Sequence, residues 1–560
     1  MVRATFAGLT TAYSALQANQ KRLDIVGQNL ANMNTVGYTR QQLETSSLNY
    51  TNPVSHYMNG SEVQVGFGTK MEKVSQIRDP YLDVQYRDQI VKSSYNDSIQ
   101  TSLDALSRIF DESNISGIRQ AFDDIQSTLT NMQDPAKVNN PIYESELKAR
   151  MQALTNLIND AARRIEREEA NEFQRLDGTG TNEHGAIQDV NNILEQIGNL
   201  NIQIKRNQIH GQPSLELMDQ RNVLLDELAS YVPIEVRYEN EKGNSLEAKD
   251  WPDDLYVDVL YKTPGGATER LEIIKGTEGG EGKNYGEVAL HDGSVDNPTD
   301  ISLMFKPAQG ISPDAPGFIK NFKAGIKENG DIAGNTFASG SIQASLNMLG
   351  QTGTGDPGDE IRGYQYYMKQ LDKLAQSFAD VMNYCNNSNA PVDPNAQPPA
   401  ADAYNILTGT SAKDIGIDPD WVNGTIHIST GKENGTDTVL DMLDAMSKTW
   451  GSGTGVWPEG ANTPLNPIPD LDNNSFADYT NHLSTILAND SQSNKTALET
   501  NITVLNGIQD SRDSMSAVSL DEEATNMMAY LSAYNAASRL MTTLDQALDT
   551  LINNTGVVGR

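Results

Sequence analysis

The sequence predicts a multidomain α+β protein: a long-helix bundle with paired N- and C-terminal coiled-coil helices and inserted β-rich outer domains. Apolar residues repeat at 3-4 spacing at both chain ends, and helical periodicity fills most of 80–232. Alternating apolar residues follow from Val232. At 560 residues the chain is too long for one hydrophobic core, so several domains are expected.

The first expected element is a helix that carries a heptad-like apolar stripe. Gln20 is the polar member of a series that otherwise consists of Phe6, Leu9, Tyr13, Leu16, Leu23 and Leu30. The stripe covers one face only, and such a helix frays unless a partner helix buries that face. The sequence therefore requires a partner for its N-terminal helix.

A matching stripe lies at the other end of the chain. Its members are Met527, Leu531, Tyr534, Ala537, Met541, Leu544, Leu548 and Leu551. Ser519 precedes Leu520-Asp521-Glu522-Glu523, which places acidic side chains in the first turn, where the helix dipole favours them. Asn553, Asn554 and Gly556 supply a stop signal.

Between the two ends the hydrophobic period changes several times. Helical patterns fill roughly 80–232, return between Ser341 and Tyr384, and appear again over 480–515, whereas 232–238, 255–261 and 301–305 alternate as strands do. These changes predict seven segments: an N-terminal coiled-coil assembly segment (1–50), a helical bundle domain (51–235), a β-rich outer domain (236–335), a helical return to the bundle (336–389), a loop-rich inserted module (390–478), a bundle helix (479–518) and a C-terminal coiled-coil assembly segment (519–560).

The composition limits which partners the chain can bind and in which compartment it is expected. The formal net charge of −33 would repel nucleic acid and anionic membranes, so neither is an expected partner. Cys385 is the single cysteine, so the chain can form no internal disulfide. The N-terminus lacks the apolar core of a signal peptide, and no stretch reaches the roughly 18 apolar residues of a membrane span. We expect a soluble chain that is cytoplasmic or exported without a cleaved signal.

Chemical motifs are weak throughout the sequence. Residues 353–358 match GxGxxG, but no strand precedes them and a proline interrupts them, so a plain loop is favoured. Residues 470–474 begin like a calcium loop, but Ser475 and Asn481 replace the required glycine and glutamate. The six histidines are scattered singly, and no GxSxG or P-loop occurs. We expect no catalytic residue, no cofactor and no metal site.

The segment from Asn29 to Gln41, NLANMNTVGYTRQ, follows directly on the first stripe. Asn32 and Asn34 tolerate the left-handed conformation that ends a helix, Gly37 permits a positive φ, and Tyr38 offers a rigid amphipathic anchor. The simplest interpretation is an ordinary helix stop, but a shorter polar linker would be expected for that purpose.

This string resembles the Asn-x-Ala-Asn-x-x-Thr-x-Gly-Tyr/Phe signature of the flagellar rod, hook and hook-associated axial proteins. The ending Gly37–Gln41 is similar to the Gly-Tyr-Ser-Arg-Gln of hook-associated members at the hook–filament junction. Val36 stands where proline is usual, and Gln28 stands where a further asparagine is common. The resemblance extends to Val63–Leu82, Leu217–Leu228 and Leu520–Leu551 but is poor over roughly 236–335 and 390–475.

The resemblance implies a structural adaptor of the bacterial flagellum, a ring that joins the hook to the filament through its terminal helices. Its implied partners are other copies of itself, hook protein on one side, a second junction protein or flagellin on the other, and a cytoplasmic export chaperone. The implied location is extracellular, after type III export without a cleaved signal peptide. The expected assembly interface comprises Phe6, Leu9, Tyr13, Leu16, Leu23, Leu30, Asn29, Ala31, Asn32, Thr35, Gly37, Tyr38, Arg40, Met527, Leu531, Tyr534, Met541, Leu544, Leu548 and Leu551.

Two other functions fit the same resemblance. The chain would be a hook or distal rod protein if it formed long homopolymers. It would be an axial protein with a hydrolase module if residues 236–475 cleaved peptidoglycan.

Overall fold

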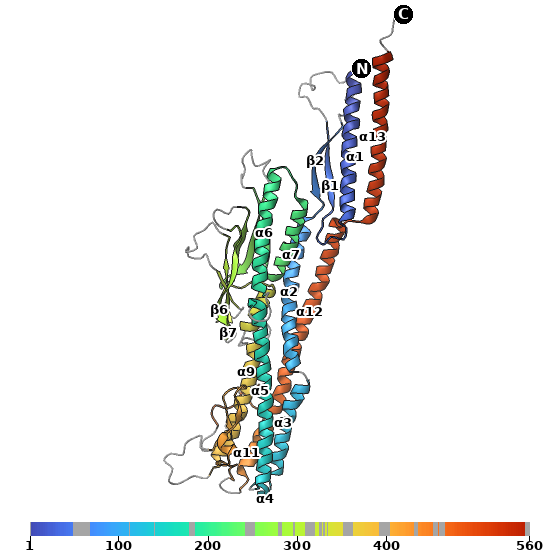
Figure 1. The fold of residues 1–560 in the computed structure, drawn as a ribbon. Helices are drawn as coiled ribbons and strands as arrows, with labels where there is room; N and C mark the ends of the chain where they lie inside the picture. Colours follow the sequence, from blue (N-terminus) through green and yellow to red (C-terminus); the bar gives the residue numbers. More distant parts are fainter. Residues whose placement is uncertain are drawn as a thin grey trace, which may run out of the picture.

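The protein is an elongated molecule whose two termini lie at the same end (Figure 1). The computed structural model describes the backbone of residues 2–48, 68–110, 112–138, 140–178, 185–240, 253–277, 283–294, 297–308, 320–323, 327–328, 331–332, 334–350, 362–390, 404–430, 435–451, 457–458 and 465–554. These residues are mostly helical, with small antiparallel sheets, which confirms the α+β class. Within the described residues, no helix has the length and apolar character needed to cross a membrane.

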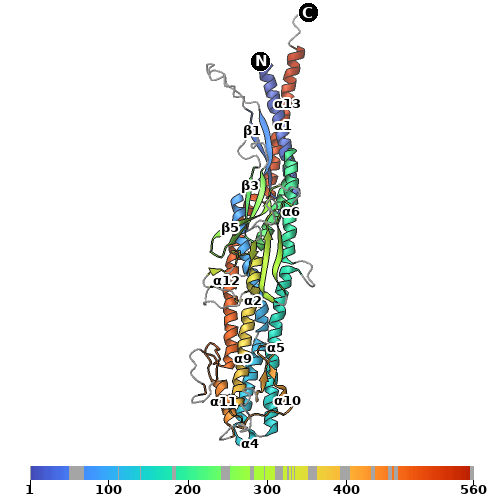
Figure 2. The same ribbon diagram turned by 90° about the vertical axis from the view of Figure 1, so that its left-hand side faces the viewer.

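Two terminal helices and one hairpin form the end that carries the termini (Figures 1 and 2). Helix α1 (Val2–Ala31) lies beside α13 (Leu520–Asn554), and the hairpin of β1 (Gln41–Ser47) and β2 (Thr69–Gln76) packs on α1. Both helices were predicted, and α13 begins directly after Ser519, whose carbonyl accepts the amide N–H of Glu523 at 3.0 Å. The hairpin was not predicted.

Long helices form the shaft below this end. They are α2 (Pro80–Ile109), α3 (Glu112–Asn131), α5 (Pro141–Asp177), α9 (Tyr364–Ser388) and α12 (Phe476–Ser516), with the short α4 (Pro135–Val138) at the tip. Asp79 and Asn140 cap α2 and α5 by accepting backbone N–H groups, and a proline follows each cap at the first helical position. The side chain of Ser475 accepts the amide of Asp478 and begins α12. The helical periods over 80–232 and 480–515 are therefore confirmed.

A second group of helices carries the larger sheets. It consists of α6 (Ala186–Ile209), α7 (Leu215–Tyr231) and α8 (Ser341–Gly350). One antiparallel sheet has the order β3-β4-β5, and the other has the order β6-β7-β8. The strands are β3 (Ile234–Glu239), β4 (Asp254–Lys262), β5 (Thr268–Lys275), β6 (Glu287–Ser294), β7 (Asn297–Lys306) and β8 (Lys320–Phe322), followed by the short pair β9 (Lys327–Glu328) and β10 (Asp331–Ile332).

Strand β4 is buried on both faces, and ion pairs make the burial of its carboxylates possible. Val257 stands opposite Val236 on β3 and Ile274 on β5, in the apolar interior. On the same strand, Asp254 accepts the Lys205 ammonium at 2.8 Å, and Asp258 accepts the Arg237 guanidinium through two bonds. Buried carboxylates are tolerated only with such partners.

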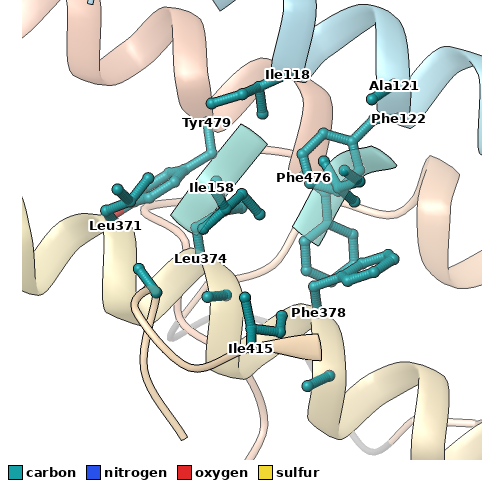
Figure 3. Close-up of a cluster of buried hydrophobic side chains, with 14 of the residues drawn as sticks. Ile118, Ala121, Phe122, Ile158, Leu371, Leu374, Phe378, Ile415, Phe476 and Tyr479 are labelled. Atoms are coloured by element: carbon teal, nitrogen blue, oxygen red, sulfur yellow. The ribbon is translucent and has the colours of Figure 1, made fainter. Parts of the chain in front are cut away.

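Two hydrophobic cores hold the shaft together. The first joins α2, α3, α5, α9 and α12, and its centre is a cluster of Phe122, Phe378 and Phe476, whose ring centroids lie 5.4 to 6.1 Å apart (Figure 3). The second joins α6 and α7 to the sheets. Helix α8 connects the two, because Ala344 and Met348 belong to the first core and Leu346 to the second.

The stretch predicted to be loop-rich, 390–478, shares the first core with the shaft. Its described part contains β11 (Leu407–Thr408), β12 (Gly416–Ile417), α10 (Pro419–Val422) and α11 (Asp437–Ser447). Buried side chains of this stretch, among them Trp421 and Trp450, lie in the same continuous core as the shaft helices.

The turn after α1 ends the helix in a way that the sequence did not predict. Gly37 has a φ of +78°, as expected, whereas Asn32 and Asn34, which tolerate the left-handed conformation, do not adopt it. Instead, the Asn32 side chain donates to the carbonyl of Gln28, and its backbone carbonyl accepts the amide of Thr35. Asparagine stops this helix by competing for backbone hydrogen bonds rather than by reversing its hand.

Candidate functional site

Helices α1 and α13 run antiparallel along their shared length. The position of Gly8 lies against Leu544, the Arg22 guanidinium lies 5.5 Å from the Tyr530 ring centroid, and the Asn29 amide reaches Glu523 at 3.3 Å. Positions that increase along α1 thus meet positions that decrease along α13. The chain brings its two ends together although they are separated by most of its length.

The α1 residues that contact α13 stand one position before the predicted leucine stripe. Residues 8, 22 and 29 are separated by multiples of seven, so they share one face of the helix. The leucines at 9, 16, 23 and 30 each follow by one residue, which turns them by about 100° around the axis. They are half-buried beside the contact line, and Tyr13 is 57% exposed. The side chain of Phe6 lies outside the described residues.

On α13 the predicted stripe and the contact face agree toward the C-terminus. Ala537 is buried, and Tyr534, Met541, Leu544 and Leu548 are half-buried. Earlier in the helix, Asn526 and Tyr530 are less exposed than their neighbours Met527 and Leu531. The exposed large apolar residues of α13 are Leu520, Met527, Met528, Leu531, Leu540, Leu551 and Ile552. A row of apolar side chains on this helix is therefore uncovered in the single chain.

The hairpin covers a further face of α1. The amide of Thr69 donates to the Ser14 hydroxyl at 3.2 Å, and the Arg22 guanidinium donates to the Thr45 hydroxyl at 3.0 Å. Arg22 therefore contacts both the hairpin and α13, since its other contact is the Tyr530 ring. The two helices and the hairpin form one unit.

Asn29 is the buried centre of the turn that leads from this unit to the shaft. Its carbonyl oxygen accepts the Gln41 amide at 3.0 Å and the Tyr38 hydroxyl at 2.9 Å, and its amide group donates to the Gln41 carbonyl at 3.1 Å and to Glu523. Burial, with the nearby charges of Glu216 and Asp219, raises the pKa of Tyr38 to about 12, so its hydroxyl stays a donor at neutral pH. The signature asparagine thus closes the turn.

Arg40 ties the same turn to the beginning of α13. Its guanidinium donates from Nε to Glu523 at 2.8 Å and from Nη1 to Glu522 at 2.6 Å, and its amide donates to the Ser516 carbonyl at 2.9 Å. Glu523 is almost fully buried, whereas Glu522 is exposed. A buried carboxylate that keeps its charge needs such a partner, and the arginine fork supplies it.

The other side of the turn is held by α7. The Thr39 hydroxyl and amide both donate to Asp219, at 2.6 and 3.1 Å. Burial raises the pKa of Asp219, although the two bonds from Thr39 oppose that shift. The positive-φ backbone of Gly37 packs directly against the Val223 side chain of the same helix.

Five more charged residues extend the connection into the shaft. Arg78 binds Asp83 through two bonds of 2.5 and 3.0 Å, and Arg512 on α12 bridges Asp83 at 2.9 Å and Asp226 at 2.6 Å. Asp226 on α7 also accepts Arg87 of α2 at 2.8 Å. We name the set of Asn29, Tyr38, Thr39, Arg40, Arg78, Asp83, Arg87, Asp219, Asp226, Arg512, Glu522 and Glu523 the joint.

The structure places the remaining signature residues on the outer side of the turn. Ala31 and Thr35 are exposed, Asn32 is half-buried, and Val36 is 90% exposed. Sequence reasoning named Asn29, Tyr38 and Arg40 but missed their acidic partners. A signal was present, because Asp219, Asp226, Glu522 and Glu523 all stand within the two stretches whose resemblance was noted.

The joint consists of hydrogen bonds and ion pairs that connect the α1/α13 pair to the shaft. Among the residues that the structure describes, no group of three or more His, Cys, Asp or Glu side chains is arranged to hold a metal ion. Cys385 is buried in the first core, where burial raises the pKa of its thiol. Asp470–Asn474 form the turn that precedes α12, and the GxGxxG string lies outside the described residues.

Profiles of three protein families match separate parts of the chain. The profile described as flagellar hook-associated protein FlgK helical domain matches residues 103–251. The flagella basal body rod protein profile matches 9–39, and the flagellar basal body rod FlgEFG protein C-terminal profile matches 509–554. Each matched segment contributes residues to the joint: Asn29 from the first part of the chain, Asp219 from the middle and Arg512 from the last.

Relatives match over nearly the full length. The chain is 28% identical over 565 residues to flagellar hook-associated protein 1 of Bacillus subtilis (strain 168), covering 99% of each chain. It is 23% identical over 587 residues to the protein of that name from Escherichia coli (strain K12), covering 97% of this chain and 99% of the relative. The solved structure of the flagellar hook junction protein FlgK from Burkholderia pseudomallei matches 55% of this chain and 44% of its own at 17% identity. Its TM-score is 0.38, too low to establish a common overall arrangement.

Proposed function

The chain belongs to the flagellar hook-associated protein 1 family, and from this premise we propose how its structure joins the flagellar hook to the filament. Relatives of the chain are named as hook-associated protein 1 and not as hook or distal rod proteins, which favours an adaptor over those alternatives. The homologues are structural proteins, and we propose that this chain, too, works without catalysis.

The observation that carries the proposal is the joint. Charged and amide side chains from both chain ends, α2, α7 and α12 fix the α1/α13 pair to the shaft in one orientation. An adaptor must pass load from its assembly helices to the rest of the molecule. Ion pairs that share arginines are suited to this because their fork geometry is directional.

The two terminal helices act as the assembly device. We propose that α1 and α13 pair as a coiled coil and that their uncovered apolar residues are buried by neighbours. The half-buried leucines of α1 and the exposed Met527, Leu531 and Leu551 of α13 supply that surface. Burying it stabilises assembly in proportion to the apolar area removed from water.

The partners that we propose are those that the family resemblance implies. Copies of the chain form a ring, with hook protein on one side and a second junction protein or flagellin on the other. Because the ring meets different partners above and below, its contacts are heterologous. The chain reaches the flagellum through the type III route with a cytoplasmic chaperone, and the β-rich residues 236–335 lie on its outer side.

The test reverses the charge at the joint. Arg40→Glu places three carboxylates together where Glu522 and Glu523 now share one cation, so we expect filaments to detach and motility to be lost. Adding Glu522→Arg and Glu523→Arg should restore attachment in part. Lys92→Glu, on an exposed position of α2, is the matched control and should remain motile. Antibody labelling should place the wild-type protein at the boundary of hook and filament, and labelling along the hook would contradict the proposal.

A further inference from the structure

A cavity of 530 Å³ lies between the end of α2 and the middle of α5, away from the joint, and its wall is basic. Arg108 of α2 and Arg164 and Arg167 of α5 line it, beside Ala105, Ile109, Glu168 and Asn171. Three arginines against one glutamate make this a positive site in a chain whose formal net charge is −33. A concave site lined by one sign of charge focuses its field on an incoming ion.

The arginines of this cavity make few strong ion pairs or hydrogen bonds within the chain. Arg164 pairs with Asp160 on its own helix at 2.8 Å, but the two side chains are 41% and 54% exposed to solvent. Arg167 donates from Nε only to the carbonyl of Arg163, at 3.4 Å, and Glu168 accepts from Asn171. Within the described residues, neither Arg108 nor Arg167 makes an ion pair. Two guanidinium groups are therefore available to a carboxylate from outside.

We propose that this cavity binds carboxylate side chains of a second copy of the chain in the assembled ring, an inference that rests on the proposed function. The net charge of the chain indicates which molecule occupies the cavity. With 75 acidic against 42 basic residues, the surface that a neighbouring copy presents is mainly acidic, and two such surfaces repel unless cations lie between them. Arginine suits this position because its fork binds carboxylates through two bonds.

The location fits a lateral contact. The residues that line the cavity belong to α2 and α5, which pack together in the shaft, and none of them belongs to the α1/α13 pair. Figure 1 shows these two shaft helices below the terminal pair. A heterologous ring presents two different faces of each copy to its neighbours, so a basic cavity on one face meets an acidic surface on the other. The terminal helices and the shaft then make separate contacts in the same ring.

The test uses full-length protein in purified flagella. Arg167→Lys keeps the charge and supplies an amine that a water-soluble carbodiimide couples to a carboxylate in direct contact. We expect a product of dimer mass whose peptides join Lys at 167 to an aspartate or glutamate of a second copy. Arg163→Lys, four residues earlier on α5 and outside the cavity lining, is the control and should give no such product.

Several outcomes would overturn the inference: coupling within one copy only, coupling to a different protein, or equal coupling of the two lysine variants. As a second measurement, Arg108→Glu with Arg167→Glu should reduce incorporation into flagella relative to Arg163→Glu, with the thermal unfolding of the monomer unchanged. Unchanged incorporation would count against the cavity. If wild-type protein is absent from the hook–filament boundary, the proposed function fails; if it is present but uncoupled, only this inference fails.

Discussion

At the residue scale, Asn29 shows why the turn after α1 needs one particular side chain. Its four hydrogen bonds use both halves of the amide: two groups donate to its oxygen and two accept from its nitrogen. Aspartate would lose the two donations and would face Glu523 with a second negative charge. Leucine would leave the Gln41 amide and the Tyr38 hydroxyl without their buried acceptor, which costs about 1–3 kcal/mol per group.

Gly37 provides the sharpest prediction at this turn. Its φ of +78° disfavours any side chain, and an added Cβ would overlap Cγ2 of Val223 on α7. We expect Gly37→Ala to destabilise the contact between the turn and α7 by about 1–3 kcal/mol, measured as faster amide hydrogen exchange over 32–40.

Gly27→Ala is the control for this substitution. Gly27 lies within α1, and a Cβ there meets nothing within 4 Å, so alanine should stabilise the helix by about 1 kcal/mol. Adding Val223→Ala to Gly37→Ala should recover the steric part of the loss but not the backbone strain. Equal exchange in Gly37→Ala and wild type would contradict the packing described for this turn.

Glu169 predicts a dependence of stability on pH. It is buried on α5, where Gln365 donates to it at 2.5 Å, and burial raises its pKa from 4.5 to about 7 despite that bond. Glu166 adds to the shift, and Lys413, which pairs with Glu166, opposes it. The folded state therefore holds the proton more tightly than the unfolded state. Stability should fall as the pH rises from about 4.5 to about 7 and should change no further above that range.

Glu169→Gln removes this titration and keeps the acceptor for Gln365. We expect it to stabilise the protein by about 1–3 kcal/mol at pH 8 and to leave it nearly unchanged at pH 4.5. The melting temperature at the two pH values measures the difference. Glu166→Gln, at an exposed position three residues earlier on α5, should show no comparable gain at pH 8. A constant difference across the pH range would refute the assignment.

At the scale of elements, the sequence predicted the helices and larger strands well because their periods are long and unmixed. The helical pattern over 80–232 and the alternation from Val232 both appear in the structure. The sequence did not predict the hairpin β1–β2, because strand β2, TKMEKVSQ, is largely exposed and polar and lacks the alternation that marks a half-buried strand.

The face of α1 that meets α13 was also beyond the sequence. The pattern of large apolar residues pointed to Leu9, Leu16 and Leu23, but the contact line runs through Gly8, Arg22 and Asn29. Small and polar residues allow two helices to approach closely and to form specific hydrogen bonds. A search for periodic apolar residues does not detect such a contact face. The ion pairs of the joint were unpredictable for a related reason, since each links segments far apart in the chain.

The two faces of α13 predict two separable defects. Leu531 is 50% exposed, so Leu531→Gln should leave the helix pair intact while it reduces filament attachment. Ala537 is buried, so Ala537→Gln should separate α13 from α1. Helical content by circular dichroism should fall in the second variant only, and attachment should fall in both. Normal attachment with Leu531→Gln would show that this face is not buried in the assembly.

At the scale of the whole molecule, the assembly helices and the body are stabilised by different means. Among the side chains that the structure describes, neither hydrophobic core contains a residue of α1 or α13, since the buried residues of both cores lie between Val91 and Leu487. The ends are attached through the hairpin and the polar joint instead. Such an arrangement allows the body to fold alone, while the α1/α13 pair is stabilised further by contacts with neighbouring subunits.

Deletion of residues 1–31 or 520–560 tests this division. Either deletion should leave the melting temperature of the body close to that of the full chain, since no core side chain is removed, and should abolish filament attachment and motility. Phe476→Ala is the reverse control: it opens a cavity beside Phe122 and Phe378 and should lower the stability of the body by about 3–5 kcal/mol. A body that unfolds when the ends are removed would mean that the joint stabilises the shaft as well as orienting the helices. Filaments that stay attached without either end would place the assembly contacts elsewhere on the chain.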